Sequence, residues 1–360
     1  MRLPKPIFIF LIAILPLKLI AKAPVLAENQ SLPKPHRIIR TCCSFGTDMQ
    51  MFALPGIKLT ETTSIEKIGS HRYLGDPTEG NGIMYSRRGG FIDMGHLRDQ
   101  ADWTAFLYTQ LNQNKANGIL VIELGHEGGE KSLNVHISPT LNNQDLISLA
   151  GKIAYDLSVW HEIATWFGAS TIPFVPERYS SFSIEDAYSN LLGVTIGMQA
   201  LQSELPYEQA VTTLIAKYLK ELEVVSTEAE TFMAMEAVRD VWWTRARKLP
   251  SAKVLIERQI QVYPCLNPWI VPGLKAENQT PMELSVPQLA SGGKSLSDFY
   301  KLQFRLNYKF PFRKIFPERK DRCITQNDFG RMLSQVETEV AKKNSNQKSK
   351  KDKLQAGTFN

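Results

Sequence analysis

Hydrophobic and polar residues alternate along residues 118–139, in two runs separated by the turn-rich sequence HEGGEK. Alternation with a period of two is typical of strands with one buried face, so this segment predicts a β-hairpin. Between residues 64 and 92, short apolar runs alternate with Gly, Asp-Pro and Gly-Asn-Gly. We therefore expect short strands and turns there, with residues 83–86 and 90–92 flanking a turn.

The spacing of hydrophobic residues becomes helical after residue 93, where one stripe is formed by Leu97, Ala101, Thr104, Tyr108 and Leu111. Further helices are predicted over residues 145–168, 183–200, 207–224 and 227–245, and an extended strand or arm over 251–263. Helices dominate after residue 143. The predicted fold class is α+β, a mainly helical body with short strands and a β-hairpin near 118–139.

The first 27 residues have the layout of a secretory signal peptide. Arg2 and Lys5 precede an apolar run that is short for a membrane span, and a small-residue pattern before Glu28 offers a cleavage point. We expect a chain that is periplasmic or secreted, with no transmembrane span once it is mature. An uncleaved anchor is the alternative.

No linker rich in Pro, Ser or Gly divides residues 28–340, and no internal repeat is present. We expect a single globular domain, with a motif-bearing core at about 40–245 and a C-terminal extension at 246–340. Residues 341–360 hold six lysines and predict a disordered tail. Weak attachment of this tail to anionic lipid or polymer is the alternative. The oligomeric state is not predicted.

The net charge of +6 is concentrated at the two ends of the chain. The signal segment carries four basic residues and no acid, and the tail has six lysines and one aspartate. The body between them is therefore slightly acidic. Because nucleic-acid binding needs a clustered basic surface, we expect no nucleic-acid partner.

Four cysteines are present, namely Cys42, Cys43, Cys265 and Cys323. In an exported protein these predict one or two disulfides that join residues 42 and 43 to the C-terminal region. The alternative is a Cys43 nucleophile paired with a histidine such as His71 or His96.

The sequence RRGGFIDMGHLRDQADW, residues 87–103, places an imidazole and several charged side chains just after a Gly-Gly turn. On a helix that begins at Asp93, His96 lies one turn from Asp99, on a stripe separate from the apolar one. An imidazole and a carboxylate on one face suit either metal binding or proton transfer. A buried, hydrogen-bonded His96 at a helix start is the simpler reading.

A second histidine lies in WHEIATWFG, residues 160–168. The sequence is similar to the HExxH zinc helix, but Thr165 stands where the second histidine is needed, which argues against a zinc protease of that type. Neighbouring helical residues point about 100° apart, so His161 and Glu162 are not both expected to face one site. A buried polar pair that locks two helices together is the structural alternative.

A third motif, SSFSIEDAYSN, occupies residues 180–190. Ser183 and Asp186 suit a helix cap, whereas Glu185 has no such role and is a candidate metal ligand. His71 is a further candidate.

Several of these motifs together resemble a known family, the bacterial domain of unknown function 4056 (DUF4056). The resemblance rests on RTCCSFG (40–46), IGSH (68–71), RGGFID (88–93), HLRD (96–99) with ADW (101–103), and SSFS (180–183) with ED (185–186) and SN (189–190). It covers residues 40–200 approximately. It implies an exported envelope protein, and it implies no reaction.

We therefore expect an uncharacterised exported envelope protein that acts as a metal-dependent hydrolase. One Zn²⁺ would be held by His96, His161 and Glu185, with an open position for water. Glu162 would take the proton of that water, and Asp99 and Arg98 would assist, with Arg98 holding anionic charge. The substrate would be an envelope glycan, lipid or peptide, inferred from location alone.

Two alternatives stay open at this point. The first is a non-catalytic envelope binding or structural module that uses an aromatic surface around Trp160, Trp166, Trp242 and Trp243. The second is the metal-free Cys-His hydrolase.

Overall fold

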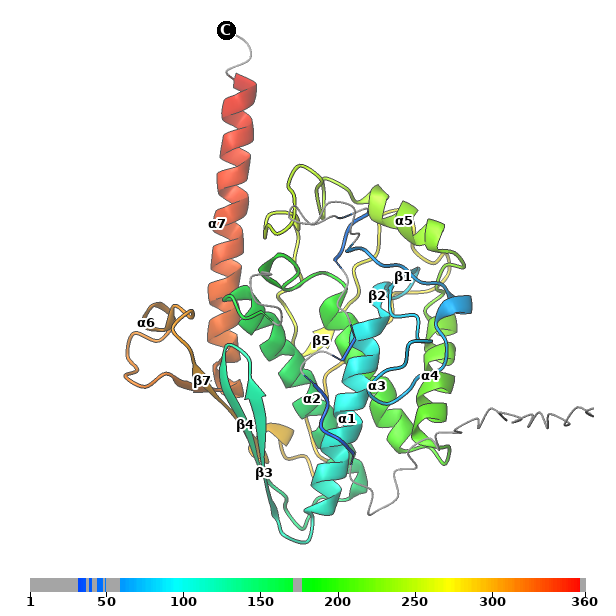
Figure 1. Ribbon diagram of the computed structural model, residues 1–360, viewed down its shortest axis with the longest axis vertical. Coiled ribbons are helices and arrows are strands. Elements are labelled where there is room, and N and C mark those ends of the chain that lie inside the picture. Colours follow the sequence, from blue (N-terminus) through cyan, green and yellow to red (C-terminus); the bar gives the residue numbers. More distant parts are fainter. Residues whose placement is uncertain are drawn as a thin grey trace, which may run out of the picture.

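The computed structural model of the chain describes residues 32–36, 39–40, 44–47, 49, 59–170 and 177–356. Figure 1 shows helices side by side in the body, a β-sheet at one side and one long C-terminal helix that extends away from it. The helices are α1 (Met94–Gln113), α2 (Asn143–Trp166), α3 (Asp186–Leu201), α4 (Tyr207–Glu221), α5 (Glu228–Ala237), α6 (Phe312–Ile315) and α7 (Phe329–Ala356). The strands are β1 (Ile83–Ser86), β2 (Gly90–Asp93), β3 (Ile119–His126), β4 (Gly129–His136), β5 (Cys265–Leu266), β6 (Leu284–Ser285), β7 (Tyr300–Leu306) and β8 (Cys323–Thr325). The predicted α+β class is confirmed.

The two predicted strand pairs are both present. β1 pairs with β2, and β3 pairs with β4, each in antiparallel register. The larger sheet has the order β3-β4-β7-β8, so strands from the C-terminal part complete the hairpin. Leu133 and Val135 alternate with more exposed residues along β4, as the period-two pattern predicts.

The helices begin where capping residues stand. Asp93 accepts hydrogen bonds from the first turn of α1, and Asn142 and Thr227 form capping boxes for α2 and α5. Several helix boundaries differ from the prediction. α2 spans Asn143–Trp166, α3 begins at Asp186, and α4 ends at Glu221. The largest difference is at the end of α5, which is Ala237 and not residue 245. Ser183 bonds to Glu185 and does not cap α3.

α1 and α3 approach closely because two glycines of α3 face α1. A Cβ atom on Gly193 would lie 2.0 Å from the carbonyl oxygen of Leu97, and one on Gly197 would lie 3.0 Å from Cα of Ala101. The apolar stripe of α1 therefore packs directly on α3. The opposite stripe of α1, which starts at His96, is left to face another part of the molecule.

The C-terminal extension packs on α2 through Trp160, which is fully buried. Its ring stacks on Phe304 of β7 at 4.0 Å and on Phe329 of α7 at 6.0 Å. One continuous hydrophobic core includes residues from Leu32 to Val336. The extension therefore covers a helix that lies in the middle of the chain.

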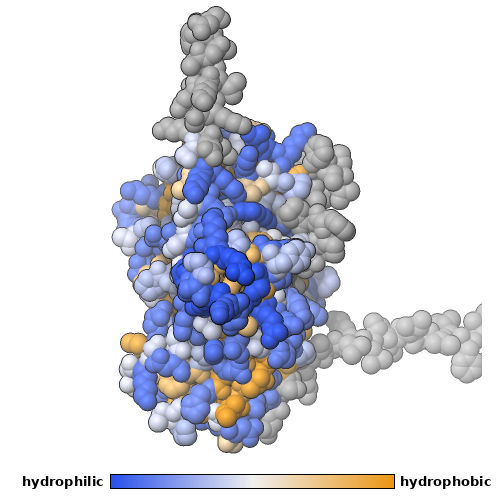
Figure 2. Space-filling view, turned by 90° about the vertical axis from the view of Figure 1, so that its left-hand side faces the viewer, coloured by the Kyte–Doolittle hydropathy of each residue, from blue (hydrophilic) through white to orange (hydrophobic). Residues whose placement is uncertain are grey.

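Residues 341–356 continue α7 as a helix. In the part of the chain that is described, no helix has both the length and the apolar character of a membrane span. Figure 2 shows a largely hydrophilic face with a hydrophobic area toward its lower end. Ile119 and Val121 of β3 are strongly exposed, at 62% and 60%.

Candidate functional site

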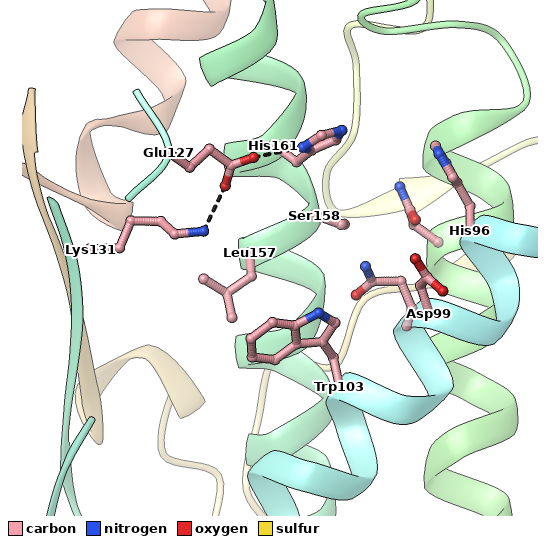
Figure 3. Close-up of a pocket in the computed structure, with 10 residues that line it drawn as sticks. His96, Asp99, Trp103, Glu127, Lys131, Leu157, Ser158 and His161 are labelled. Atoms are coloured by element: carbon pink, nitrogen blue, oxygen red, sulfur yellow. Dashed lines mark hydrogen bonds and ion pairs between the residues drawn. The ribbon is translucent and has the colours of Figure 1, made fainter. Parts of the chain in front are cut away.

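A cavity lies between α1, α2, α3 and the turn that joins β3 to β4 (Figure 3). It holds about 530 Å³ of empty space, including the part open to solvent. Its lining consists of His96, Asp99, Gln100, Trp103, Glu127, Lys131, Leu157, Ser158, His161 and Asn190. The lining is mainly polar and contains two imidazoles, which come from two different helices.

The wall from α1 is set by the start of that helix. The carboxylate of Asp93 accepts hydrogen bonds from the backbone N–H groups of Gly95 at 2.7 Å and His96 at 3.0 Å. This cap fixes the helical phase, so His96, Asp99 and Trp103 recur on one side and line the cavity.

On the α2 wall, His161 is held by a carboxylate from the β3–β4 turn. Its Nδ1 lies 2.7 Å from Oε1 of Glu127, and the other oxygen of Glu127 lies 2.6 Å from the ammonium group of Lys131 (Figure 3). Glu127 is buried because the turn folds onto α2, where its carbonyl oxygen accepts a hydrogen bond from Trp160 at 3.1 Å. The imidazole is thereby oriented by a fixed carboxylate.

His96 also has a carboxylate beside its ring. Its Nδ1 lies 3.2 Å from Oδ1 of Asp186, the first residue of α3. Burial, together with the charges of Glu162, Glu185 and Asp93, raises the pKa of Asp186 well above its ordinary value. The Nδ1 atom of His96 therefore faces a buried carboxyl group whose protonated form is favoured by burial and by the neighbouring acids.

Four buried carboxyl groups gather behind His96, namely Asp93, Glu162, Glu185 and Asp186. Burial also raises the pKa of Glu185, to about 8, although a hydrogen bond from Ser183 opposes the shift. Arg258 is close enough for these acids to stabilise its charge, while burial lowers its pKa to about 10. The raised pKa values of Glu185 and Asp186 reflect burial and the repulsion between neighbouring carboxylates in the cluster.

Asp99 connects the cavity to the N-terminal arm, which we define as residues 32–40. Its carboxylate accepts hydrogen bonds from the backbone N–H groups of Ile39 and Arg40 and lies 3.0 Å from the Arg40 guanidinium. Burial raises the pKa of Asp99 to about 6 despite the opposing charge of Arg40. The same guanidinium binds Glu79 and Asp102, so the arm is fastened to α1 just below the cavity.

Comparison with known proteins gives one match. The sequence model of a family described as "Protein of unknown function (DUF4056)" matches residues 29–272. The chain belongs to the DUF4056 family. No curated protein and no solved structure shows a significant similarity to it. The match extends beyond the region of about 40–200 in which the sequence motifs occur, and it includes the whole lining of the cavity in this DUF4056 chain.

Three of the six predicted site residues meet in the cavity. His96, Asp99 and His161 all line it, although they come from two helices. The expectation that only one of His161 and Glu162 faces the site fits the structure. Glu162 points away from the cavity, is buried, and accepts a hydrogen bond from the backbone N–H of Phe182.

The other two predicted residues do not line the cavity. Arg98 is fully buried on the far side of α1, where its guanidinium lies 3.1 Å from Glu79. Glu185 is buried behind His96 and accepts a hydrogen bond from the Ser183 hydroxyl at 2.6 Å. Neither residue is placed to act on a molecule in the cavity.

These positions bear on the zinc hypothesis. Across the described ranges, no group of three or more His, Cys, Asp or Glu side chains is placed to hold a metal ion. His96 and His161 each face their own carboxylate, and Glu185 is not in the cavity with them. The donor set that the sequence suggested does not fit a zinc ion as it stands, so no catalytic step is assigned to one.

The sequence did not single out Glu127 and Lys131. Both lie in or next to the polar turn HEGGEK, which has the composition of an exposed hairpin tip. The Gly-Gly pair in this turn was the sequence feature that could have indicated close packing of the turn against the body. Gly128 and Gly129 have φ of +70° and +158°, and a Cβ atom on Gly129 would lie 2.0 Å from the carbonyl oxygen of Arg305. A turn packed this closely against the body carries its neighbouring side chains inward.

The aromatic surface expected around four tryptophans is not present. Trp160, Trp166 and Trp243 are fully buried and Trp242 is nearly so. The structure therefore removes the surface on which the binding-module alternative was based.

Of the cysteines, Cys265 and Cys323 are both exposed and carry free thiols. Cys42 and Cys43 lie outside the described residues, so a Cys43 nucleophile stays a prediction. His71, its suggested partner, is buried with Nε2 3.0 Å from Asp102.

Proposed function

We propose that this protein is a hydrolase that acts on a component of the bacterial envelope, and that its cavity works by general acid–base catalysis. The observation that carries the proposal is a pair of imidazoles in one solvent-connected cavity, each with Nδ1 beside a carboxylate. An imidazole held in this way exchanges protons through its other ring nitrogen.

His161 is assigned as the general base. Glu127 orients the ring and favours the imidazolium that forms when His161 takes a proton. Lys131 lies 2.6 Å from the other oxygen of Glu127 and so places a positive charge beside this carboxylate. Because the Ser158 hydroxyl donates to the carbonyl oxygen of Tyr155 at 2.7 Å, we assign the attack to water and not to this serine.

His96 is assigned as the general acid. Its Nδ1 lies 3.2 Å from Asp186, whose pKa is raised by burial, and we assign to His96 the transfer of a proton to the leaving group of the substrate. Water thus loses one proton to His161 as it attacks, and the leaving group gains one from His96. The two histidines return to their starting states by exchanging a proton with solvent.

The other residues that line the cavity could bind a small polar group that is part of a larger substrate. Trp103 and Leu157 offer apolar contact, while Gln100 and Asn190 offer hydrogen bonds. Substrate classes that fit an exported protein are the glycan, lipid and peptide parts of the envelope. The location rests on the sequence of residues 1–27, which lie outside the described part of the chain.

The experiment uses the chain from residue 28 onward, incubated with fractionated envelope glycan, lipid and peptide, with products followed by mass spectrometry. We expect new hydrolysis products that disappear with His161→Gln. His126→Gln is the matched control because this histidine is 79% exposed on the same hairpin and lies outside the cavity. Products that persist in His161→Gln, or none from any fraction, would reject the proposal.

The same preparation tests the zinc alternative, if purified without chelator. Stoichiometric zinc that is lost in both His96→Gln and His161→Gln would replace protein-only catalysis with the metal mechanism. Zinc retained by both variants would assign the metal to another place.

A further inference from the structure

A second polar site lies on the other side of α2, at the end of that helix. The indole of Trp166 is fully buried, and three cationic groups lie around its ring. The ring centre is 4.3 Å from the ammonium of Lys343, 4.4 Å from the guanidinium of Arg178 and 5.3 Å from that of Arg258. One aromatic ring stabilises a cation on its face, but three cations around it also repel each other.

Trp166, Arg258 and Lys343 border a pocket between α2, residues 252–258 and α7, which we call the Trp166 pocket. It holds about 250 Å³ of empty space, including the part open to solvent. It is lined by Trp166, Ala252, Lys253, Leu255, Ile256, Arg258, Val340, Lys343 and Asn344. The pocket thus adds a fourth cation, Lys253, to the three that surround the ring.

The carboxylates near this pocket do not balance four cations. Glu339 lies 2.9 Å from Arg178 and accepts a hydrogen bond from the indole N–H of Trp166 at 3.1 Å. The buried acids near His96 act on Arg258, whose guanidinium donates only to backbone carbonyl oxygens of Ser181, Tyr179 and Ala252. The charge of Glu339 also acts on Lys343, but Glu339 is shared with Arg178 and Lys314, which lie 2.9 Å and 3.8 Å from it.

The electrostatic consequence appears at Lys343. Burial, followed by the charges of Arg178 and Arg258, lowers the pKa of Lys343 to about 8. In addition, Nε of Arg178 is buried and has no hydrogen-bond acceptor among the residues that the structure describes. A bound anion would supply both the hydrogen-bond acceptors and the negative charge that these cationic side chains lack.

We propose that the Trp166 pocket binds a phosphate group, with Lys253 and Lys343 as its direct ligands and Arg178 and Arg258 as supporting charge. Two separate segments, the residue 252–258 stretch and α7, supply the donors that line the pocket. Arg178 of η2 (Glu177–Tyr179) adds positive charge over the Trp166 ring. A tetrahedral phosphate presents oxygens in several directions and carries up to two charges, whereas a carboxylate presents two oxygens in one plane. The phosphate belongs either to a soluble molecule or to a lipid headgroup.

The test measures binding of inorganic phosphate to the chain from residue 28 by calorimetry, at constant ionic strength set with chloride. We expect saturable binding that weakens at least tenfold in Lys343→Gln and in Lys253→Gln. Lys301→Gln is the control, because this exposed lysine of β7 lies outside the pocket. Absence of saturable binding, equal affinity for sulfate, or an equal loss in Lys301→Gln would overturn the phosphate assignment.

Vesicles distinguish the two sources of phosphate. Flotation with phosphatidylglycerol vesicles that is reduced in Lys343→Gln, and absent with phosphatidylcholine, assigns the site to a lipid headgroup. Phosphate binding without flotation assigns it to a soluble molecule. Flotation that Lys343→Gln leaves unchanged arises from other lysines of the tail and contradicts the lipid assignment.

Discussion

At the scale of single residues, the important feature is that each cavity histidine is held by a carboxylate from another element. Glu127 reaches His161 from a hairpin turn, and Asp186 reaches His96 from the start of α3. The orientation of both rings therefore depends on tertiary contacts, not on the helices that carry the histidines. Sequence spacing could suggest the histidines but not their partners.

Because Glu127 contacts His161, we expect that removing the charge of Glu127 lowers the hydrolase activity. In Glu127→Gln, the turnover of the substrate found with envelope fractions should fall by about 10²- to 10⁴-fold, because the ring loses its orientation and its counter-charge. Lys131→Gln is the comparison. It breaks the same 2.6 Å ion pair but leaves the His161 contact in place, so its loss of activity should be smaller. Equal losses would contradict the assigned role of Glu127.

A second prediction at this scale concerns Glu79. Burial raises its pKa, but the hydrogen bond and charge of Arg40, with the charge of Arg98, outweigh burial and lower it to about 2. The folded-state pKa is below the unfolded value, so the stabilisation is complete above pH 4.5 and is lost as pH falls toward 2. The raised pKa of Asp99 acts in the opposite direction, but over a higher range, from about 4 to 6.

Urea unfolding between pH 5 and pH 2.5 measures this effect. The free energy of unfolding of the wild type should fall steeply below pH 4.5, by up to about 3 kcal/mol from this group. Glu79→Gln should be less stable throughout and should show a shallower decline. Parallel curves for the two proteins would mean that Glu79 is not the group responsible.

At the scale of elements, much of the fold could be predicted from local pattern. The hairpin β3–β4 followed from alternation, and the start of α1 near Asp93 followed from the onset of helical spacing. The inward packing of the β3–β4 turn could not be predicted, because it depends on Arg305 and Phe310, which lie far along the chain. Arg98 was assigned to the site for a related reason, since spacing alone does not say which face of α1 meets which neighbour.

The close contact of α1 with α3 predicts a large effect at Gly193. Gly193→Ala should lower the free energy of unfolding by about 1–3 kcal/mol, because the new methyl group overlaps the backbone of α1. Gly330→Ala on α7 is the matched control. A Cβ atom there meets nothing within 4 Å, so this variant should be unchanged or slightly more stable. Similar losses in both variants, measured by urea unfolding, would contradict close packing of α1 on α3.

At the scale of the whole molecule, the hydrophobic core extends further along the chain than the region that the family model matches. The match ends at residue 272, whereas core residues continue to Val336 and cover Trp160 on α2. The sequence predicted a C-terminal extension after residue 245 but could not show where it packs. Its aromatic residues can pack against any apolar surface, so the sequence does not identify α2 as their neighbour. In the structure the extension supports the helix that carries His161.

Truncation tests this dependence. A chain ending at residue 272 lacks β7, β8 and α7, and so exposes Trp160 and the inner face of β4. We expect it to lose cooperative unfolding and to bind a hydrophobic dye, whereas a chain ending at residue 345 should unfold like the full-length protein. A cooperative transition of the shorter chain at the full-length temperature would contradict this account of the core.

The central claim is that His96 and His161 act on one substrate as a unit. The most direct test is a double-mutant cycle in which the turnover of the identified substrate is measured for His96→Gln, His161→Gln and the double variant. If the two rings serve the same reaction, each single variant should lose nearly all activity and the double variant should lose little more. The claim would be contradicted if the loss of turnover in the double variant equalled the product of the two single losses. A His96→Gln variant as active as the wild type would also contradict it.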